Sequence, residues 1–155
     1  MTNLDRLDAA FIVTAFLFQL ILIVHFTLRK WRFAAAMRFG PLVYALGAPA
    51  AVLSLVLLLG GKDWSLWLGG FLYLAWGLFG YTVEYLRKVQ WRNPIRWSVF
   101  VPYLLLYLGT SMFYWFPLAL VWKPLWFVQA VLFAASLWLN VSSHAAPPEA
   151  THPAA

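Results

Sequence analysis

The sequence contains no cysteine, and this absence removes several classes of chemistry at once. A chain without cysteine forms no disulfide, offers no thiolate to a metal or an iron–sulfur cluster, and has no cysteine nucleophile. The H-E-x-x-H, G-x-S-x-G and P-loop patterns of metalloproteases, serine hydrolases and nucleotide-binding proteins are missing as well. The sequence therefore favours a non-enzymatic protein, and it identifies neither a cofactor nor a metal site.

Charged residues are the second shortage. Asp, Glu, Lys and Arg make up 10% of the 155 residues and hydrophobic residues 64%, whereas soluble domains have about 25% and about half, respectively. Since a soluble core cannot bury this much apolar surface, the composition predicts an integral membrane protein. The net charge of +6 does not indicate nucleic-acid binding, because the basic residues adjoin apolar runs, where they orient a membrane protein.

Long stretches without charge mark the expected membrane crossings. Five such stretches contain 20, 23, 20, 26 and 25 residues, and a helix needs roughly 20 apolar residues to cross the hydrocarbon core. They predict an all-α, polytopic transmembrane helix bundle that forms a single domain over residues 1–141. The expected spans are about 9–28, 41–59, 64–86, 97–116 and 120–140, followed by a disordered cytoplasmic tail at 142–155.

The last two spans are separated by one charge, Lys123, and a few turn-forming residues. A single helix over residues 97–140 would be about 66 Å long, against a hydrocarbon core of about 30 Å. Two passes that turn between Pro117 and Pro124 fit this length. Four spans with a re-entrant hairpin are the alternative.

Lysine and arginine are distributed unevenly between the two ends of the spans. Eight lie in the first and third connections, and three lie on the other side. The positive-inside rule then predicts an outer N-terminus and a cytoplasmic C-terminus in a plasma (inner) membrane. Nine of the ten tryptophans fall near the predicted boundaries, as aromatic belts do, and only Trp76 lies near mid-membrane.

The third span has a glycine-rich face that ends in an acid. The residues of that face, spaced three and four apart, are Gly70, Tyr73, Gly77, Gly80 and Glu84. Such a face allows another helix to approach closely, or leaves room for a slender apolar ligand with the carboxylate at its polar end. Glu84 can also pair with Arg87 and Lys88 and simply end the helix at the interface.

His25 is the only histidine within a predicted span, one helical turn before Arg29 and at the expected depth of Glu84. An imidazole there can pair with the acid, shuttle a proton, or hold the head group of a quinone or lipid; alternatively it bonds to a backbone carbonyl or water. A ligand seated between the third and fourth spans would also meet Trp76 and Tyr107. A lone intramembrane imidazole does not predict a metal site.

Several residues predict close contacts between helices. Gln19 and Gln129 are amides in hydrocarbon, and each should bond to another helix. Pro49 should bend the second span. Small residues four apart, which permit close packing, occur as Gly47 with Ala51 and as Ala130 with Ala134.

The cytoplasmic connections interleave basic and aromatic residues, which predicts contact with anionic lipids of the inner leaflet. The expected head-group contacts are Arg29, Lys30, Arg32, Arg87, Lys88, Arg92 and Arg96.

Two hypotheses of function follow from the sequence. The first is a non-catalytic accessory or assembly subunit that forms homo- or hetero-oligomers with other membrane proteins. The second is a binder or transporter of a hydrophobic small molecule, such as a quinone, isoprenoid, tetrapyrrole or lipid, in an intramembrane groove.

Overall fold

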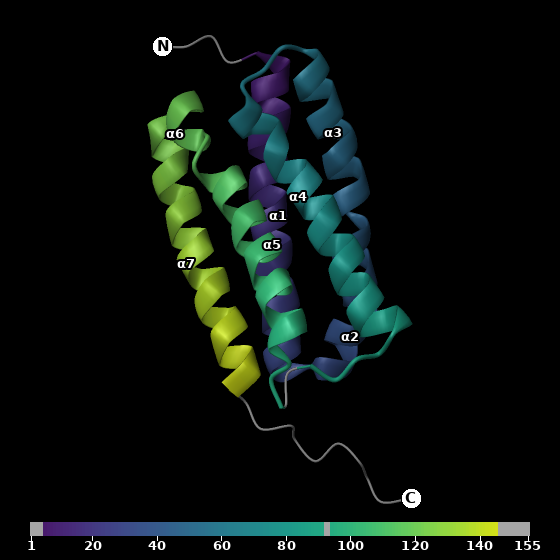
Figure 1. Ribbon diagram of the computed structural model, residues 1–155. Coiled ribbons are helices and arrows are strands. Elements are labelled where there is room, and N and C mark those ends of the chain that lie inside the picture. Colours follow the sequence, from purple (N-terminus) through teal and green to yellow (C-terminus); the bar gives the residue numbers. More distant parts are fainter. Residues whose placement is uncertain (1–4, 92–93, 146–155) are drawn as a thin grey trace, which may run out of the picture.

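The computed structural model describes residues 5–91 and 94–145, which fold into a bundle of long helices (Figure 1). The elements are α1 (Arg6–Trp31), α2 (Phe33–Ala45), α3 (Gly47–Leu59), α4 (Trp64–Tyr81), the π-helical turn η1 (Thr82–Leu86), α5 (Trp97–Trp115), α6 (Leu118–Val121) and α7 (Lys123–Ala145). Among the described residues, five helical segments are long and apolar enough to cross a membrane. This confirms the predicted five-span, all-α bundle.

Two helices extend beyond the spans expected from charge. The second span begins at Phe33, because the stretch before Pro41 is rich in alanine and other helix formers. The first connection is therefore reduced to Arg32, and Arg38 projects from a helix. At the other end of the chain, α7 continues through Ser142 to Ala145, the first residues of the expected tail. The remainder of that tail, 146–155, lies outside the described residues.

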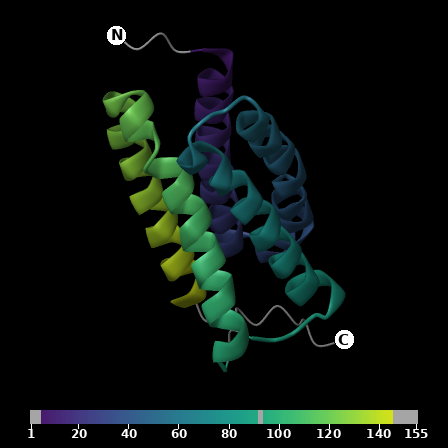
Figure 2. The ribbon, with the colours of Figure 1, turned by 45° about the horizontal axis from the view of Figure 1, so that its top comes forward.

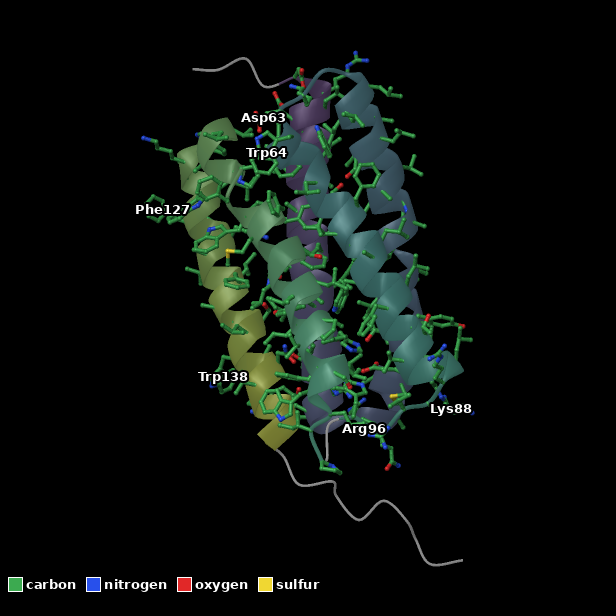
Figure 3. The ribbon with its side chains drawn as sticks, in the orientation of Figure 1. Asp63, Trp64, Lys88, Arg96, Phe127 and Trp138 are labelled. Carbon is green, nitrogen blue, oxygen red and sulfur yellow. The ribbon has the colours of Figure 1, made fainter. Side chains whose placement is uncertain are left out.

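The helices surround an interior formed mainly by α1, α4 and α5. α1 packs against α2 and α7, while α4 packs against α2, α3 and α5. Figure 2 shows α4 and α5 crossing in front of α1, with α7 on one side and α3 on the other. The ends of α1 and η1 and the starts of α2 and α5 lie at one end of the bundle, where Figure 3 labels Lys88, Arg96 and Trp138. Asp63 and Trp64 lie at the opposite end.

Two prolines lie within the second span, and one of them leaves a carbonyl that bonds to another helix. Pro49 removes an amide donor and crowds the preceding turn, and the helix is interrupted at Leu46, as the sequence predicts. Pro41 lies inside α2 and cannot donate to the carbonyl of Met37. The hydroxyl of Tyr85 in η1 donates to that carbonyl instead, at 3.0 Å.

Amide side chains join α1 to α7, as predicted. Gln19 donates to the hydroxyl of Ser136 and to the carbonyl of Leu132, the latter at 3.3 Å. Gln129 donates to the carbonyl of Ala15 at 3.2 Å. These bonds satisfy polar groups that hydrocarbon cannot, and they fix the register of the two helices.

Among the small-residue pairs, Gly47 and Ala51 are both buried, and Gly47 lies against the backbone of Leu74 in α4. Ala134, in contrast, is exposed on the outer side of α7. Ala130 and Ala134 therefore do not form a buried packing pair within this chain.

Replacing Gln19 by leucine is expected to lower the free energy of unfolding by about 0.6–1.7 kcal/mol, the range found for hydrogen bonds between membrane helices. Titration with dodecyl sulfate in mixed micelles would measure it. Thr14→Val is the matched control, because the Thr14 hydroxyl bonds to the carbonyl of Ala10 in its own helix. Equal losses in the two variants would contradict a role for Gln19 in joining α1 to α7.

A cluster of charges closes the end of the bundle at which α1 begins. Asp5 caps α1 in a reciprocal pair with Asp8, each carboxylate accepting from the other residue's backbone amide. Lys62, in the connection between α3 and α4, lies 2.7 Å from a carboxylate oxygen of Asp5 and 2.6 Å from one of Asp8. The hydrogen bond from Lys62 lowers the pKa of Asp5, and its two carboxylate partners raise the pKa of Lys62.

The lowered pKa sets the direction of a pH effect. Because Asp5 in the folded chain titrates below its ordinary 3.8, the pairing stabilises the fold above that pH, and the contribution disappears as the pH falls through the lowered pKa. A ¹³C NMR titration of the carboxyl groups should show that Lys62→Gln moves the Asp5 midpoint up toward 3.8. Asp63, whose pKa is lowered by hydrogen bonds from Ser65, should keep its midpoint in that variant. An unmoved Asp5 midpoint would refute the pairing.

Candidate functional site

Glu84 lies in η1, a π-helical turn that ends the third span. Turns of this kind are rare in proteins and often occur at functional sites. The side chain of Glu84 is only 7% exposed, although glutamates are almost never buried without a partner. The turn therefore carries a carboxylate into the bundle, where it requires compensation.

The compensation comes from three other helices. Nη1 of Arg29 in α1 lies 3.8 Å from Oε1 of Glu84, and the hydroxyl of Tyr44 in α2 donates to Oε2 at 2.9 Å. Tyr103 in α5 is buried beside them and interacts with the Tyr44 hydroxyl. We call these four residues the Arg29–Glu84 cluster. It ties together every span except the last.

This arrangement changes two expectations. Arg29 was expected among the lipid head-group contacts, but its side chain is 8% exposed and its partner is Glu84. One of the two interpretations of Glu84 paired it with the adjacent Arg87 and Lys88, which are exposed at the end of the bundle. The carboxylate reaches instead a cation 55 positions earlier in the chain, since α1 and α4 run in the same direction and both residues lie near the ends of these spans, at the same end of the bundle.

The glycine-rich face of α4 packs against the second span. A Cβ at Gly77 would lie 2.6 Å from the carbonyl oxygen of Tyr44, and one at Gly80 would lie 2.7 Å from the Tyr44 ring. A Cβ at Gly70 would collide with Ala50 and Ser54 of α3. Of the two interpretations of this face, the structure shows close helix packing, and α2 and α3 cover the surface on which a ligand was expected.

Tyr73 and Trp76 belong to a continuous aromatic interior. The ring of Trp76 has four tyrosine neighbours at centroid distances of 5.1 to 6.1 Å, namely Tyr44, Tyr73, Tyr103 and Tyr107. The Tyr73 hydroxyl donates to the carbonyl of Val43 at 2.6 Å. Trp76 and Tyr107 are therefore packed core residues in this structure.

His25 is 3% exposed and lies between aromatic rings near the same end of the bundle. Its ring centroid is 5.5 Å from that of Phe26 and 6.5 Å from that of Phe39. Its Nδ1 has no hydrogen-bond partner among the described residues. The acid–imidazole pair expected with Glu84 is thus not formed through this nitrogen, and Arg29 occupies the position beside the carboxylate.

Most of the other expected head-group residues lie on the surface at one end of the bundle. Arg32, Arg87, Lys88 and Arg96 are exposed at one end of the bundle. The ammonium of Lys30 lies 5.0 Å from the Trp31 ring and 4.5 Å from the Trp138 ring, which joins α1 to α7 at this end. Arg92 lies outside the described residues.

Tyr44 and Tyr85 were not among the candidate site residues, and Arg29 was assigned to the lipid interface, whereas its side chain is buried. The structure shows that Arg29 shares a face of α1 with the buried Phe18, Leu22 and His25, but α1 is apolar on its other faces too, so the sequence did not indicate which face is buried. Tyr44 had no signal either, since the second span is apolar on all sides. Only the position of α4 reveals its role.

The site holds paired charges and hydroxyls and lacks the donor set of a metal centre: in residues 5–91 and 94–145 no three His, Cys, Asp or Glu side chains come together. No protein-family model, no curated protein and no solved structure matches the chain. Its function must therefore be argued from these residues alone.

Proposed function

We propose that this protein is a non-catalytic subunit of a membrane complex, with an accessory or assembly role. One observation carries the proposal: Glu84 bonds to Arg29 and Tyr44 of other helices, and the amide nitrogens of Gln19 and Gln129 join α1 to α7. These interior polar side chains therefore stabilise the bundle by joining its helices. The described connections between helices are short, so the apolar outer faces are what the molecule offers to a partner.

The proposal includes a membrane and an orientation. The basic residues that gather at the end with Lys88 and Arg96 support an orientation with this end in the cytoplasm, the N-terminus outside and the C-terminus inside. The membrane is then the plasma (inner) membrane. Exposed Arg32, Arg87 and Lys88 would contact anionic lipids of the inner leaflet, each contributing about 1 kcal/mol. We assign this lipid contact to anchoring.

The partner is another membrane protein, either a second copy or a different chain. Each outer face offers a strongly exposed side chain where a photo-crosslinking residue can be placed. Suitable positions are Val13 on α1, Val52 on α3, Leu105 on α5 and Val131 on α7. A specific partner protein would be crosslinked from only one or two of these positions. If only lipid surrounded the molecule, all four positions would give crosslinks to lipid.

Purification from native membranes in mild detergent tests the proposal. We expect a partner protein at fixed stoichiometry and protein crosslinks confined to part of the surface. A lone monomer with crosslinks to lipid from every position would overturn it. A monomer whose organic extract contains one stoichiometric quinone, isoprenoid, tetrapyrrole or lipid, lost in Glu84→Gln, would overturn it in favour of the binder or transporter.

A further inference from the structure

A groove lies on the outer surface where α6 meets α7, at the end of the bundle opposite the basic residues. It encloses about 420 Å³, including the part open to the surroundings, and it is lined by Ala119, Lys123, Trp126 and Phe127. Figure 3 shows Phe127 projecting outward from α7 in the half of the bundle that contains Asp63 and Trp64.

The local sequence explains why the groove exists. Lys123, Trp126 and Phe127 are three and four residues apart and therefore share one face of α7. α6 is a single turn, and its Ala119 is too small to fill the space beside that face. The wall formed by Trp126 is held in place, because Trp126 stacks on Trp115 at a centroid distance of 5.0 Å and its carbonyl accepts the Trp115 indole N–H at 3.0 Å.

The chemistry of the groove combines an apolar lining with a cation at its mouth. The lining surface is apolar, and the Phe127 side chain is 64% exposed. Lys123 is exposed at the start of α7 and forms no ion pair with any described residue. In this it differs from Lys62 at the same end, which is held by Asp5 and Asp8. Its methylene stem can line the groove while its ammonium stays at head-group depth.

We propose that this groove binds one anionic phospholipid of the adjacent leaflet, with an acyl chain between Ala119 and Phe127 and the phosphate paired with Lys123. The outer face of α7 continues the path of the chain, since Val131 and Ala134 are exposed below Phe127. From Lys123 to Ala134 the helix rises about 16 Å, roughly half of a hydrocarbon core of about 30 Å. The path thus has the depth of one leaflet.

This site is separate from the head-group contacts proposed above. Those residues lie at the other end of the bundle and face the opposite leaflet. The inference also does not depend on the identity of any protein partner, because the groove, its stacked wall and its free ammonium belong to this chain alone.

Native mass spectrometry of the detergent-purified protein, with phosphatidylglycerol or phosphatidylcholine added at equal concentration, tests the proposal. The wild type should retain one phosphatidylglycerol in preference to phosphatidylcholine. Lys123→Gln should reduce this preference about fivefold, the ratio that corresponds to one basic contact. Lys62→Gln is the matched control and should keep the preference, because its ammonium is already paired. Equal losses in both variants would overturn the assignment to Lys123.

A second variant examines the groove itself. Ala119→Phe fills it without changing charge, and should remove the single retained lipid while the bundle still unfolds at the wild-type dodecyl sulfate concentration. Glycerol phosphate, which has the anionic group but no acyl chain, should not displace the lipid. Retention of the lipid in Ala119→Phe, or displacement by glycerol phosphate, would show that the groove plays no part.

Discussion

Replacing Arg29 by leucine is expected to destabilise the bundle by about 3–5 kcal/mol, the cost of leaving a buried charge without its partner. Glu84 would keep the hydrogen bond from Tyr44 but lose the guanidinium 3.8 Å away. Because the Glu84 side chain is only 7% exposed, water compensates little for the lost guanidinium. Unfolding by dodecyl sulfate in mixed micelles would show the loss directly.

The double variant Arg29→Leu/Glu84→Leu distinguishes the buried pair from a general effect of substitution. Replacing both members of a buried pair by apolar side chains is often neutral or stabilising, so the double variant should be more stable than Arg29→Leu alone. Arg32→Leu is the control for loss of charge, because Arg32 is exposed; it should change stability by no more than about 0.5 kcal/mol. An Arg29→Leu variant as stable as Arg32→Leu would contradict the cluster.

Replacing Gly77 by alanine is expected to cost about 3 kcal/mol, at the upper end of the range for overpacked interiors. The added Cβ would lie 2.6 Å from the carbonyl oxygen of Tyr44, a backbone atom that cannot rotate away. Since Tyr44 also bonds to Glu84, separation of α4 from α2 would weaken the Arg29–Glu84 cluster as well.

Gly109→Ala provides a control of opposite sign. The nearest atom to a Cβ at Gly109 is the flexible end of Leu72 at 3.4 Å, an ordinary contact. Alanine should therefore stabilise α5 by about 0.5–1 kcal/mol through its greater helix propensity. Both variants can be compared in the same mixed-micelle titration. Stabilisation of equal size at the two positions would show that helix propensity, and not the approach of α2, determines the outcome at Gly77.

Much of the architecture follows from the solvent that the sequence demands. With hydrocarbon outside the helices, runs without charge must be helical and must cross, so the spans could be placed within a few residues from the positions of Asp, Glu, Lys and Arg. The start of α2 was misplaced because a charged residue marks where a side chain reaches the interface and does not mark where a helix begins. Arg38 is exposed, but it lies within α2, which begins at Phe33.

The rotation of each helix about its own axis could not be obtained in this way. Spans such as α3 and α4 are apolar on every side, and a helix of this kind has no polar face to indicate which side is buried. The glycines of α4 indicated a close approach, but they did not identify the helix that makes it. The ligand groove expected between the third and fourth spans depended on that rotation, and the structure shows the glycines against the second span.

The sequence by itself therefore determined the class of protein, its five crossings and the uneven distribution of its basic residues. These features follow from hydrocarbon as the solvent of each helix, and they do not depend on which helices pack together. Only the tertiary structure decided that Glu84 pairs with Arg29 and Tyr44, and that a groove lined by Ala119 and Phe127 remains open on the surface. Each depends on which faces of separate helices touch, and that is set by the packing of all the side chains together.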